Sequence, residues 1–334
     1  MGKTQVFRCA ILACVALLAA FSPEVPKMVS NNANEEEEAV IVPKVRSFAN
    51  SPLTLTLPNL LLAGAQKAGS SALASWLLKD GNGVCGGKPK DDEPLHTTKE
   101  LHFFDRGDRY KKGYKFYMDH YNHCFEGDGS ILNKTKPIHG WIMDATPDTI
   151  RYYQRVKKTY QQHPEMLKEL RIVVSLREPI SRELSMYNHI LSHQFKGDLN
   201  YGPPLAGPTN GTWMGFTEFV EKYTIPTLYT TNISSVNHYA KYLKQFFELI
   251  PREQILVLNY HTDVKAGDIA KKRLRAFLAP HTTLPVQPDG PLEQRNEQVS
   301  PHKVKIVPCS AVRIMRNHTD NFNAELYKLL EEYP

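Results

Sequence analysis

The segment over residues 60–73 constrains the fold of this chain most. It reads Leu-Leu-Leu-Ala-Gly-Ala-Gln-Lys-Ala-Gly-Ser-Ser-Ala-Leu, which is an apolar run, a loop bounded by two glycines and a helix start. Such a strand, loop and helix present backbone N–H groups to an anion. In a nucleoside-triphosphate loop, lysine follows the second glycine and the next hydroxyl holds magnesium. Here Lys67 precedes Gly69 and Ser70 follows it directly, so the sequence predicts an anion cradle without that metal-binding arrangement.

A second anion-binding pattern lies at residues 171–187. Its first part, Arg-Ile-Val-Val-Ser-Leu, is typical of a buried parallel strand, and Pro179 suits the first turn of a helix. Arg177 is therefore expected at the carboxyl end of a strand, with Ser185 on the following helix, on the same side as Ser181. Ligands of open α/β sheets bind at this edge, so Arg177 and Ser185 are expected to meet over one anion. In the structural alternative, Arg177 pairs with a neighbouring glutamate.

Together, these two stretches resemble the sulfotransferase family that uses 3′-phosphoadenosine 5′-phosphosulfate (PAPS), and specifically its Golgi, carbohydrate-modifying branch. The resemblance covers residues 55–334 and implies a 3′-phosphate site at Arg177 and Ser185. It also implies a loop for the 5′-phosphosulfate of the donor. The implied loop ligands are Gln66, Lys67, Ala68, Gly69, Ser70 and Ser71. Arg295 is a further candidate, in a stretch that fits either a loop closing over the donor or a solvated loop.

A third stretch, residues 99–105, supplies the candidate base. Its sequence, Lys-Glu-Leu-His-Phe-Phe-Asp, resembles the segment with the catalytic acid/base residue in the heparan and chondroitin branch. A carboxylate can remove the proton of a sugar hydroxyl when burial and neighbours tune its pKa. The resemblance implies Glu100 as the base, with His102 as the rival and a surface pair of Lys99 and Glu100 as the structural alternative. The apolar alternation predicts a short strand with Glu100 and His102 on one face.

The implied chemistry is in-line transfer of a sulfuryl group to a hydroxyl of a glycosaminoglycan-like carbohydrate. Lys67 would stabilise charge on the leaving 5′-phosphate, and Glu100 would deprotonate the acceptor. No metal is implied. Residues 144–148, Asp-Ala-Thr-Pro-Asp, resemble a family segment in which heparan-type members often carry lysine in place of Ala145. This favours chondroitin- or galactosamine-type acceptors over heparan, and a small-molecule or tyrosine acceptor stays open.

Two other functions remain as alternatives. A nucleotide-dependent kinase would need a metal-binding hydroxyl directly after a loop lysine, which is missing here. A catalytically silent lumenal glycan-binding protein would need neither Lys67 nor Glu100. Nucleic-acid binding has no motif support. The net charge is +6, and cations around the candidate base are interpreted as a groove for an anionic glycan or as solvated side chains. These cations are Lys88, Lys90, Lys99, Arg106, Arg109, Lys111 and Lys112.

The motifs predict an α/β fold: a single P-loop-like domain with a central parallel sheet flanked by helices on both faces. Two anion-binding motifs that lie far apart in sequence must converge on one site, so we expect one sulfotransferase domain over residues 55–334. The amphipathic run 239–247 and the apolar run 255–258 predict a helix followed by a buried strand.

The N-terminal segment bears on the compartment. An apolar run over residues 9–21 is short for a membrane span of ~20 residues and fits a signal-peptide core of ~7–15 residues. Residues 1–22 are interpreted as a signal anchor, with a cleaved signal peptide as the alternative, and polar residues 23–54 as a flexible stem. The expectation is a single-pass type II Golgi membrane protein with a lumenal catalytic domain, or else a secreted protein.

Other residues agree with a lumenal domain. Sequons for glycosylation occur at Asn133, Asn210, Asn232 and Asn317. Among the cysteines after the apolar run, Cys85 and Cys124 are the nearer pair in sequence and form the possible disulfide. The cysteines and histidines show no zinc-binding spacing, and the sequence leaves the oligomeric state open.

Overall fold

The computed structural model describes residues 57–79, 82–89, 99–125, 140–205, 212–228, 238–279, 292 and 302–333. The expected anchor and stem lie outside these residues, as do Lys90, Asn133, Asn210, Asn232 and Arg295. No helix within the described ranges is long and apolar enough to cross a membrane.

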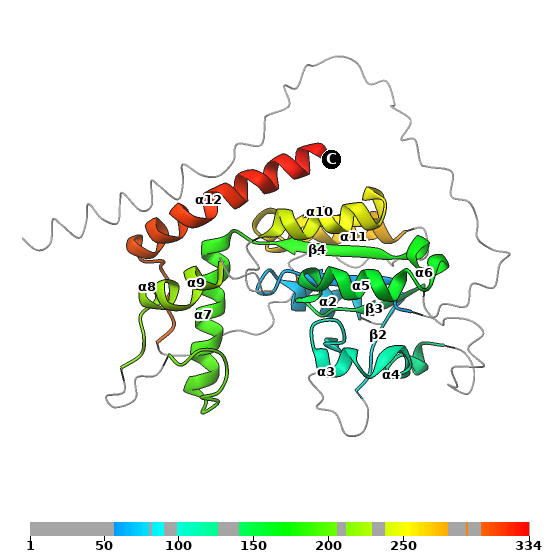
Figure 1. Cartoon of the computed structure of the whole chain (residues 1–334), viewed down its shortest axis with the longest axis horizontal. Coiled ribbons are helices and arrows are strands. Elements are labelled where there is room, and N and C mark those ends of the chain that lie inside the picture. The colour runs from blue at the N-terminus through cyan, green and yellow to red at the C-terminus, as the bar shows by residue number, and fades with distance from the viewer. Residues whose placement is uncertain are drawn as a thin grey trace, which may run out of the picture.

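The fold is built on one sheet of five strands, all parallel, in the order β2-β3-β1-β4-β5 (Figure 1). In chain order the strands are β1 (Leu60–Gly64), β2 (Val84–Gly86), β3 (Trp141–Asp144), β4 (Arg171–Leu176) and β5 (Ile255–Asn259). The central strand β1 is buried along its whole length, as expected for a parallel strand covered on both faces. In register, Leu60 lies between Met143 of β3 and Arg171 of β4.

Helices connect the strands. They are α2 (Ser70–Leu77), α3 (Gly107–Tyr110), α4 (Gly113–Asp119), α5 (Tyr153–Tyr160), α6 (Pro164–Glu169), α7 (Pro179–Phe195), α8 (Phe216–Phe219), α9 (Ile225–Leu228), α10 (Tyr239–Leu249), α11 (Asp268–Leu278) and α12 (Cys309–Glu332). Turns of 3₁₀ or π type are η2 (Asn122–Cys124), η3 (Thr149–Tyr152), η4 (Val220–Thr224), η5 (Arg252–Gln254) and η6 (Tyr260–Val264). Figure 1 shows α7, α8 and α9 beside the first turns of α12, at one end of the sheet.

Alternate residues of β1 enter separate hydrophobic cores. Leu60 and Leu62 pack in a core that includes Leu274 of α11, whereas Leu61 packs in a second core with Phe246 of α10. Helices therefore cover both faces of the sheet, which confirms the predicted fold class. The amphipathic run 239–247 forms most of α10, and β5 follows it as predicted.

The second motif folds as the sequence predicts. Arg177 follows the last residue of β4, and Pro179 is the first residue of α7. The Glu178 carboxylate caps this helix, accepting hydrogen bonds from the N–H groups of Ile180 at 2.9 Å and Ser181 at 2.7 Å. A proline at the first helical position and an acidic cap together fix where α7 begins, and hence where Arg177 lies.

Candidate active site

Strand β4 holds the loop over residues 65–69. The Ala65 N–H donates to the Ser175 carbonyl at 2.7 Å, and the Ser175 hydroxyl donates to the Ala68 carbonyl at 2.6 Å. Ser175 has no exposed surface, so both bonds are shielded from water. Ser175, in the second motif, thus holds the loop of the first motif in place through two buried hydrogen bonds.

Two backbone conformations shape the loop. Gly69 adopts φ 88° as the residue before α2, and a Cβ there would lie 2.7 Å from a methyl carbon of Val264. Lys67 has φ 67°, and His102 has φ 51°. Among the described residues these two are the non-glycine positions with positive φ, a conformation that is uncommon and gathers at functional sites. The strained positions coincide with two predicted catalytic residues.

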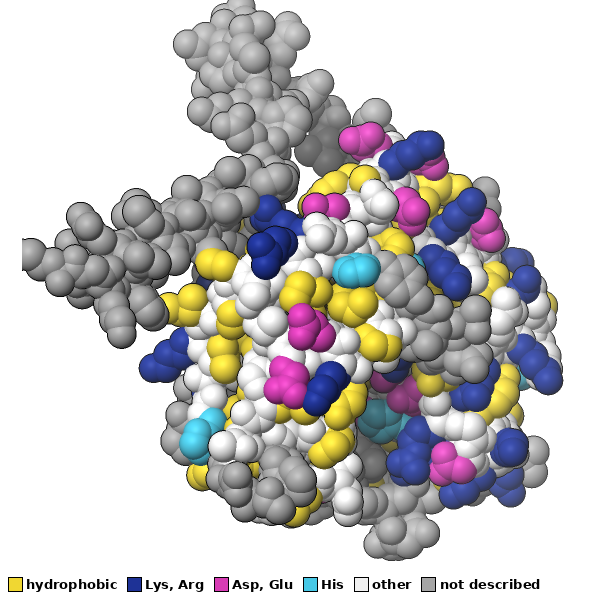
Figure 2. Space-filling model, turned by 60° about the vertical axis from the view of Figure 1, so that its left-hand side comes forward, with side chains coloured by type: hydrophobic (Ala, Val, Ile, Leu, Met, Phe, Trp, Pro, Cys, Tyr) yellow, Lys and Arg dark blue, Asp and Glu magenta, His cyan; other side chains and the backbone are white. Residues whose placement is uncertain are grey.

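A cavity of 980 Å³ opens in front of the loop. Its lining includes eight of the predicted residues: Gln66, Lys67, Gly69, Ser70, Ser71, Glu100, Arg177 and Ser185. Ala68 is buried, and its contribution to the site is its carbonyl bond to Ser175. On one face of the molecule, Figure 2 shows a hollow with histidine and acidic side chains inside and Lys or Arg side chains on its rim. The structure therefore brings residues from all three motifs to one place.

Arg177 connects the two anion-binding motifs. Its Nη1 donates to the Lys67 carbonyl at 2.9 Å, and its Nε donates to the Ser181 hydroxyl at 3.1 Å. The guanidinium also lies over the ring of Tyr260, 4.3 Å from the centroid. The two glutamates of the structural alternative are engaged elsewhere: Glu178 caps α7, and Glu183 pairs with Arg182. Arg177 thus lines the cavity and holds the loop at the same time.

Lys67 lies in a strongly positive environment. Burial, together with the smaller effect of the charges of Arg177, Arg182 and Lys99, lowers its pKa to about 8. Clustered cations that share a partly buried cavity repel one another. An anion bound between Lys67 and Arg177 would relieve this repulsion, so the electrostatics favour an anionic ligand.

Glu100 lies at the end of a chain of polar contacts. Asp105 Oδ2 contacts His102 Nδ1 at 2.7 Å, and His102 Nε2 is 3.5 Å from Glu100 Oε2. The other carboxylate oxygen pairs with the Lys99 ammonium. The pair of Lys99 and Glu100 that was the structural alternative is thus present, yet Glu100 also lines the cavity. Of the two candidate bases, Glu100 lines the cavity and His102 does not, although His102 contacts the Glu100 carboxylate.

The predicted short strand over residues 99–105 is wrong. This segment is irregular, because His102 has a left-handed backbone that breaks the extended repeat. It crosses the end of β3 instead, where the Ala145 N–H donates to the Lys99 carbonyl at 3.0 Å and the His102 N–H donates to the Thr146 hydroxyl at 3.1 Å. Glu100 and His102 still meet, through this turn and not through a strand face.

Asp144 anchors this crossing in a way that the sequence did not predict. It is buried, accepts hydrogen bonds from the Tyr117 hydroxyl at 2.8 Å and the Thr146 hydroxyl at 2.7 Å, and its pKa is raised by burial. The Thr146 hydroxyl that donates to Asp144 is also the one that receives the His102 N–H. The motif resemblance pointed to this stretch, but nothing in the sequence indicated its contact with His102.

The opposite wall of the cavity comes from α7 and from the segment before α12. His189 Nε2 contacts the Tyr201 hydroxyl at 2.9 Å, and burial lowers the pKa of His189 to about 4, with the Lys67 charge adding to the effect. Asn188 makes two hydrogen bonds of 2.9 Å with the backbone of Val304. This contact brings two lysines to the wall. The lining residues that sequence reasoning missed are Asn188, His189, Tyr201, Tyr260, Lys265, Lys303 and Lys305.

The described cations near the candidate base do not line this cavity, and a glycan groove formed by them stays a prediction. Arg109 is buried and donates to the Leu101 carbonyl at 2.7 Å, while exposed Arg106 pairs with Asp108. None of the described members of that group lines the cavity. The lysines and the arginine that do line the cavity come from the loop, from the residue after β4 and from later segments of the chain. These segments come together only in the folded state.

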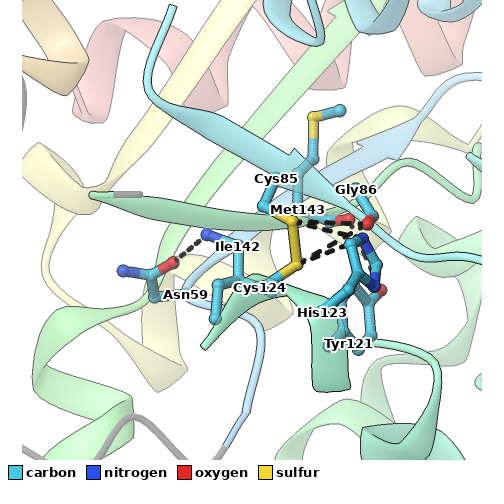
Figure 3. The surroundings of a disulfide bond; sticks show 8 residues. All are labelled: Asn59, Cys85, Gly86, Tyr121, His123, Cys124, Ile142 and Met143. Carbon is cyan, nitrogen blue, oxygen red and sulfur yellow. Dashed lines mark hydrogen bonds between the residues drawn. A yellow bond between two sulfur atoms is a disulfide. The ribbon is translucent and has the colours of Figure 1, made fainter. Parts of the chain in front are cut away.

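Two further predicted features are partly described. Cys85 and Cys124 form a disulfide that joins the edge strand β2 to η2 (Figure 3). Asn317 is exposed on α12, whereas Thr319 of the same sequon is buried and donates to the Met315 carbonyl. The glycosylation of Asn317 stays a prediction.

Two curated proteins are similar to parts of this chain. No family model matches the chain. It is 27% identical over 157 residues to a bifunctional heparan sulfate N-deacetylase/N-sulfotransferase 1 from Caenorhabditis elegans, covering 47% of this chain and 15% of that protein. It is 25% identical over 240 residues to human heparan sulfate glucosamine 3-O-sulfotransferase 3B1, covering 70% of this chain and 50% of that protein. The chain thus spans half or less of the curated relatives it matches.

A solved structure shares the fold. The crystal structure of a sulfotransferase from Alicyclobacillus acidocaldarius matches 82% of this chain and 96% of its own, with a TM-score of 0.50 and 17% sequence identity. Both curated relatives are named as sulfotransferases, and the solved structure shares the fold. Together they support the assignment of this chain to a sulfotransferase family, within the transferases.

Proposed function

We propose that this protein transfers a sulfuryl group from PAPS to a hydroxyl of a carbohydrate. The observation that carries the proposal is the convergence of Lys67, Arg177 and Glu100 on one cavity. Lys67 and Arg177 can each bind an anionic group, as a donor with phosphates at both ends requires. The Glu100 carboxylate can accept the proton of the acceptor hydroxyl. The match to sulfotransferases supports the same reading.

The loop fits the 5′-phosphosulfate end of the donor. Gly69 lets the loop pack closely against η6, because a side chain there would meet Val264. The first turn of α2 directs N–H groups at the loop, and Ser70 and Ser71 line the cavity beside Lys67. At the other end, Arg177 and Ser185 would hold the 3′-phosphate, since α7 places Ser185 one turn beyond Ser181.

Side chains of this protein would then stabilise the charge on the leaving group and accept the proton of the acceptor hydroxyl. The Lys67 ammonium stabilises the negative charge that develops on the leaving phosphate oxygen. Glu100 accepts the proton of the acceptor hydroxyl while the Lys99 ammonium holds its second oxygen. His102, oriented by Asp105, stands beside the carboxylate and can share that proton. Both loop and base are fixed by hydrogen bonds before any ligand binds, which reduces the cost of alignment.

The acceptor we propose is an anionic glycan that reaches the cavity along its second wall. Lys303 and Lys305 line that wall with His189 and Tyr201, so it combines positive charge with neutral hydrogen-bonding groups. Both curated relatives carry heparan sulfate in their names. Ala145, where the resemblance has lysine in heparan-type members, keeps chondroitin-type acceptors in the proposal. A Golgi location, with residues 1–22 as the membrane anchor and the domain in the lumen, completes it.

A transfer assay tests this function. The full chain is incubated with sulfur-labelled PAPS and a panel of desulfated heparan, chondroitin and dermatan chains, and label in the polysaccharide is counted. We expect transfer to at least one glycan, and a loss of at least 100-fold for Lys67→Ala and for Glu100→Gln. Lys222→Ala is the control, because this exposed lysine pairs with Glu218 away from the cavity. Full transfer by either folded active-site variant would show that the assigned roles are wrong.

A further inference from the structure

A cluster of metal-binding side chains lies away from the cavity, at the disulfide. His123 precedes Cys124 in η2, and its Nε2 lies 3.4 Å from Cys85 Sγ and 3.6 Å from Cys124 Sγ. The Gly86 carbonyl oxygen lies 3.7 Å from each of the two sulfur atoms. Figure 3 shows the imidazole and this carbonyl pointing at the sulfur pair. Two sulfurs, a nitrogen and an oxygen thus converge on one point.

These separations match a tetrahedral zinc site. With Zn–S near 2.3 Å, Zn–N near 2.05 Å and Zn–O near 2.1 Å, a tetrahedron has S···N edges of ~3.5 Å and S···O edges of ~3.6 Å. The four distances given above agree with these edges to about 0.2 Å. The sulfur–sulfur edge would have to lengthen to ~3.8 Å once the disulfide is broken.

We propose that the reduced form of this protein binds one Zn²⁺ through Cys85, Cys124 and His123. The Gly86 carbonyl or a water takes the fourth position. A phosphine reductant breaks the S–S bond: phosphorus loses two electrons and becomes the phosphine oxide with oxygen from water, and the two protons of that water go to the sulfurs. Zinc then displaces both thiol protons and binds the thiolates with the neutral imidazole.

The position of the cluster gives the site a structural purpose. Cys85 belongs to the edge strand β2, which pairs only with β3 among the described strands, and Cys124 belongs to η2. Cys85 is 7% exposed and Cys124 is fully buried, so a bound ion would be shielded from water. The disulfide closes a loop with a sequence separation of 39 that contains Lys99 and Glu100. A zinc ion at the same atoms would close the same loop under reducing conditions, where the disulfide is lost.

Zinc titration of the full chain tests the proposal. The protein is reduced anaerobically with a phosphine, freed of excess reagent and titrated with zinc against a chelating indicator. We expect one zinc per reduced chain, none at this site in the oxidised chain, and affinities at least tenfold weaker for Cys85→Ser and His123→Ala. Cys309→Ser is the matched control for a cysteine that is also disulfide-bonded, and His163→Ala for a histidine outside the cluster. Both controls should bind zinc like the unmodified chain.

Cobalt gives a readout that does not depend on the variants folding. Reduced, unmodified protein with Co²⁺ should show sulfur-to-cobalt charge-transfer absorption and the intense visible bands of a tetrahedral ion. A reduced chain that keeps its native circular dichroism but takes up less than a tenth of an equivalent of zinc would overturn the proposal. Equal zinc affinity in the unmodified chain, Cys85→Ser and His123→Ala would overturn it too.

Discussion

Arg177 donates a hydrogen bond from Nη1 to the carbonyl oxygen of Lys67 at 2.9 Å, across a sequence separation of 110 residues. This bond ties the end of β4 to the loop after β1, and the Ser175 hydroxyl strengthens the same connection through Ala68. The two proposed phosphate sites are therefore coupled through these hydrogen bonds. A substitution at one site should change ligand binding at the other.

Replacing Arg177 by alanine should weaken donor binding at both ends. The variant loses a charge-assisted contact worth ~1.5–3 kcal/mol, so we expect the Kd for 3′-phosphoadenosine 5′-phosphate to rise roughly 10- to 100-fold. Calorimetric titration measures this, with Arg106→Ala as the control because Arg106 is exposed and pairs with Asp108. The variant should also lose its preference for the 3′-phosphorylated nucleotide over the unphosphorylated one. An unchanged preference would remove Arg177 from the 3′-phosphate site.

Gly69→Ala should abolish donor binding, whereas Gly113→Ala should not. Both glycines have positive φ, 88° and 78°, so alanine costs each roughly 1–2 kcal/mol of backbone strain. A Cβ at Gly69 would in addition meet Val264 at 2.7 Å, while at Gly113 nothing lies within 4 Å. Urea unfolding should therefore show a larger loss of unfolding free energy for Gly69→Ala. Equal losses, with donor binding intact in both, would contradict the proposed close packing of the loop.

Donor affinity should fall as pH rises above about 8. The pKa of Lys67 is lowered to about 8, mainly by burial, and only the protonated ammonium attracts the donor's anionic groups. Affinity should fall about twofold between pH 7 and 8 and then by up to tenfold per pH unit for each proton that binding requires. Lys99, with its pKa also lowered to about 8 by burial, adds to the fall. A Lys67→Met variant should bind weakly with a shallower slope, and an equally steep slope in that variant would exclude Lys67 as the titrating group.

The same lysines affect folding in the opposite sense. A lysine whose folded pKa lies below its ordinary value of 10.5 binds fewer protons in the native state than in the unfolded chain. Its contribution to the free energy of unfolding therefore rises with pH between about 8 and 10.5. A loss of donor affinity in this pH range would thus reflect the site and not unfolding caused by Lys67.

Loss of the disulfide should destabilise the domain. A Cys85→Ser, Cys124→Ser double variant releases the loop with a sequence separation of 39, which corresponds to about 2–4 kcal/mol of unfolding free energy. Urea unfolding in the presence of a metal chelator measures this effect alone. Activity should fall with it, because the loop holds Glu100. A double variant with unchanged stability and unchanged activity would show that the crosslink supports neither.

Sequence patterns predicted those parts of the site whose structure is determined by neighbouring residues in the chain. A strand, a glycine turn and a helix start determine where Lys67 lies, and Pro179 determines where α7 begins. These features depend on neighbouring residues in the chain. The predicted place of Arg177 in the site followed from the rule that ligands of open sheets bind at the carboxyl edge.

The missed parts depend on contacts between distant segments. The irregular turn at His102 is held by a hydrogen bond to Thr146. The apolar alternation over residues 99–105 fits a strand, so it did not indicate the left-handed backbone at His102. The lysines of the cavity wall are brought in by the bonds between Asn188 and Val304, which join segments 116 residues apart. Arg109 looked like a surface cation by composition but is buried against the Leu101 carbonyl.

Donor binding without metal tests the central claim most directly. The free energy that a ligand adds to the native state raises the melting temperature, so thermal unfolding of the full chain is compared with 3′-phosphoadenosine 5′-phosphate plus chelator and with ATP plus magnesium. The account predicts that the bisphosphate stabilises the unmodified protein in the presence of chelator, and that Lys67→Met and Arg177→Ala lose most of this stabilisation. Stabilisation by ATP with magnesium alone, and none by the bisphosphate, would contradict the account.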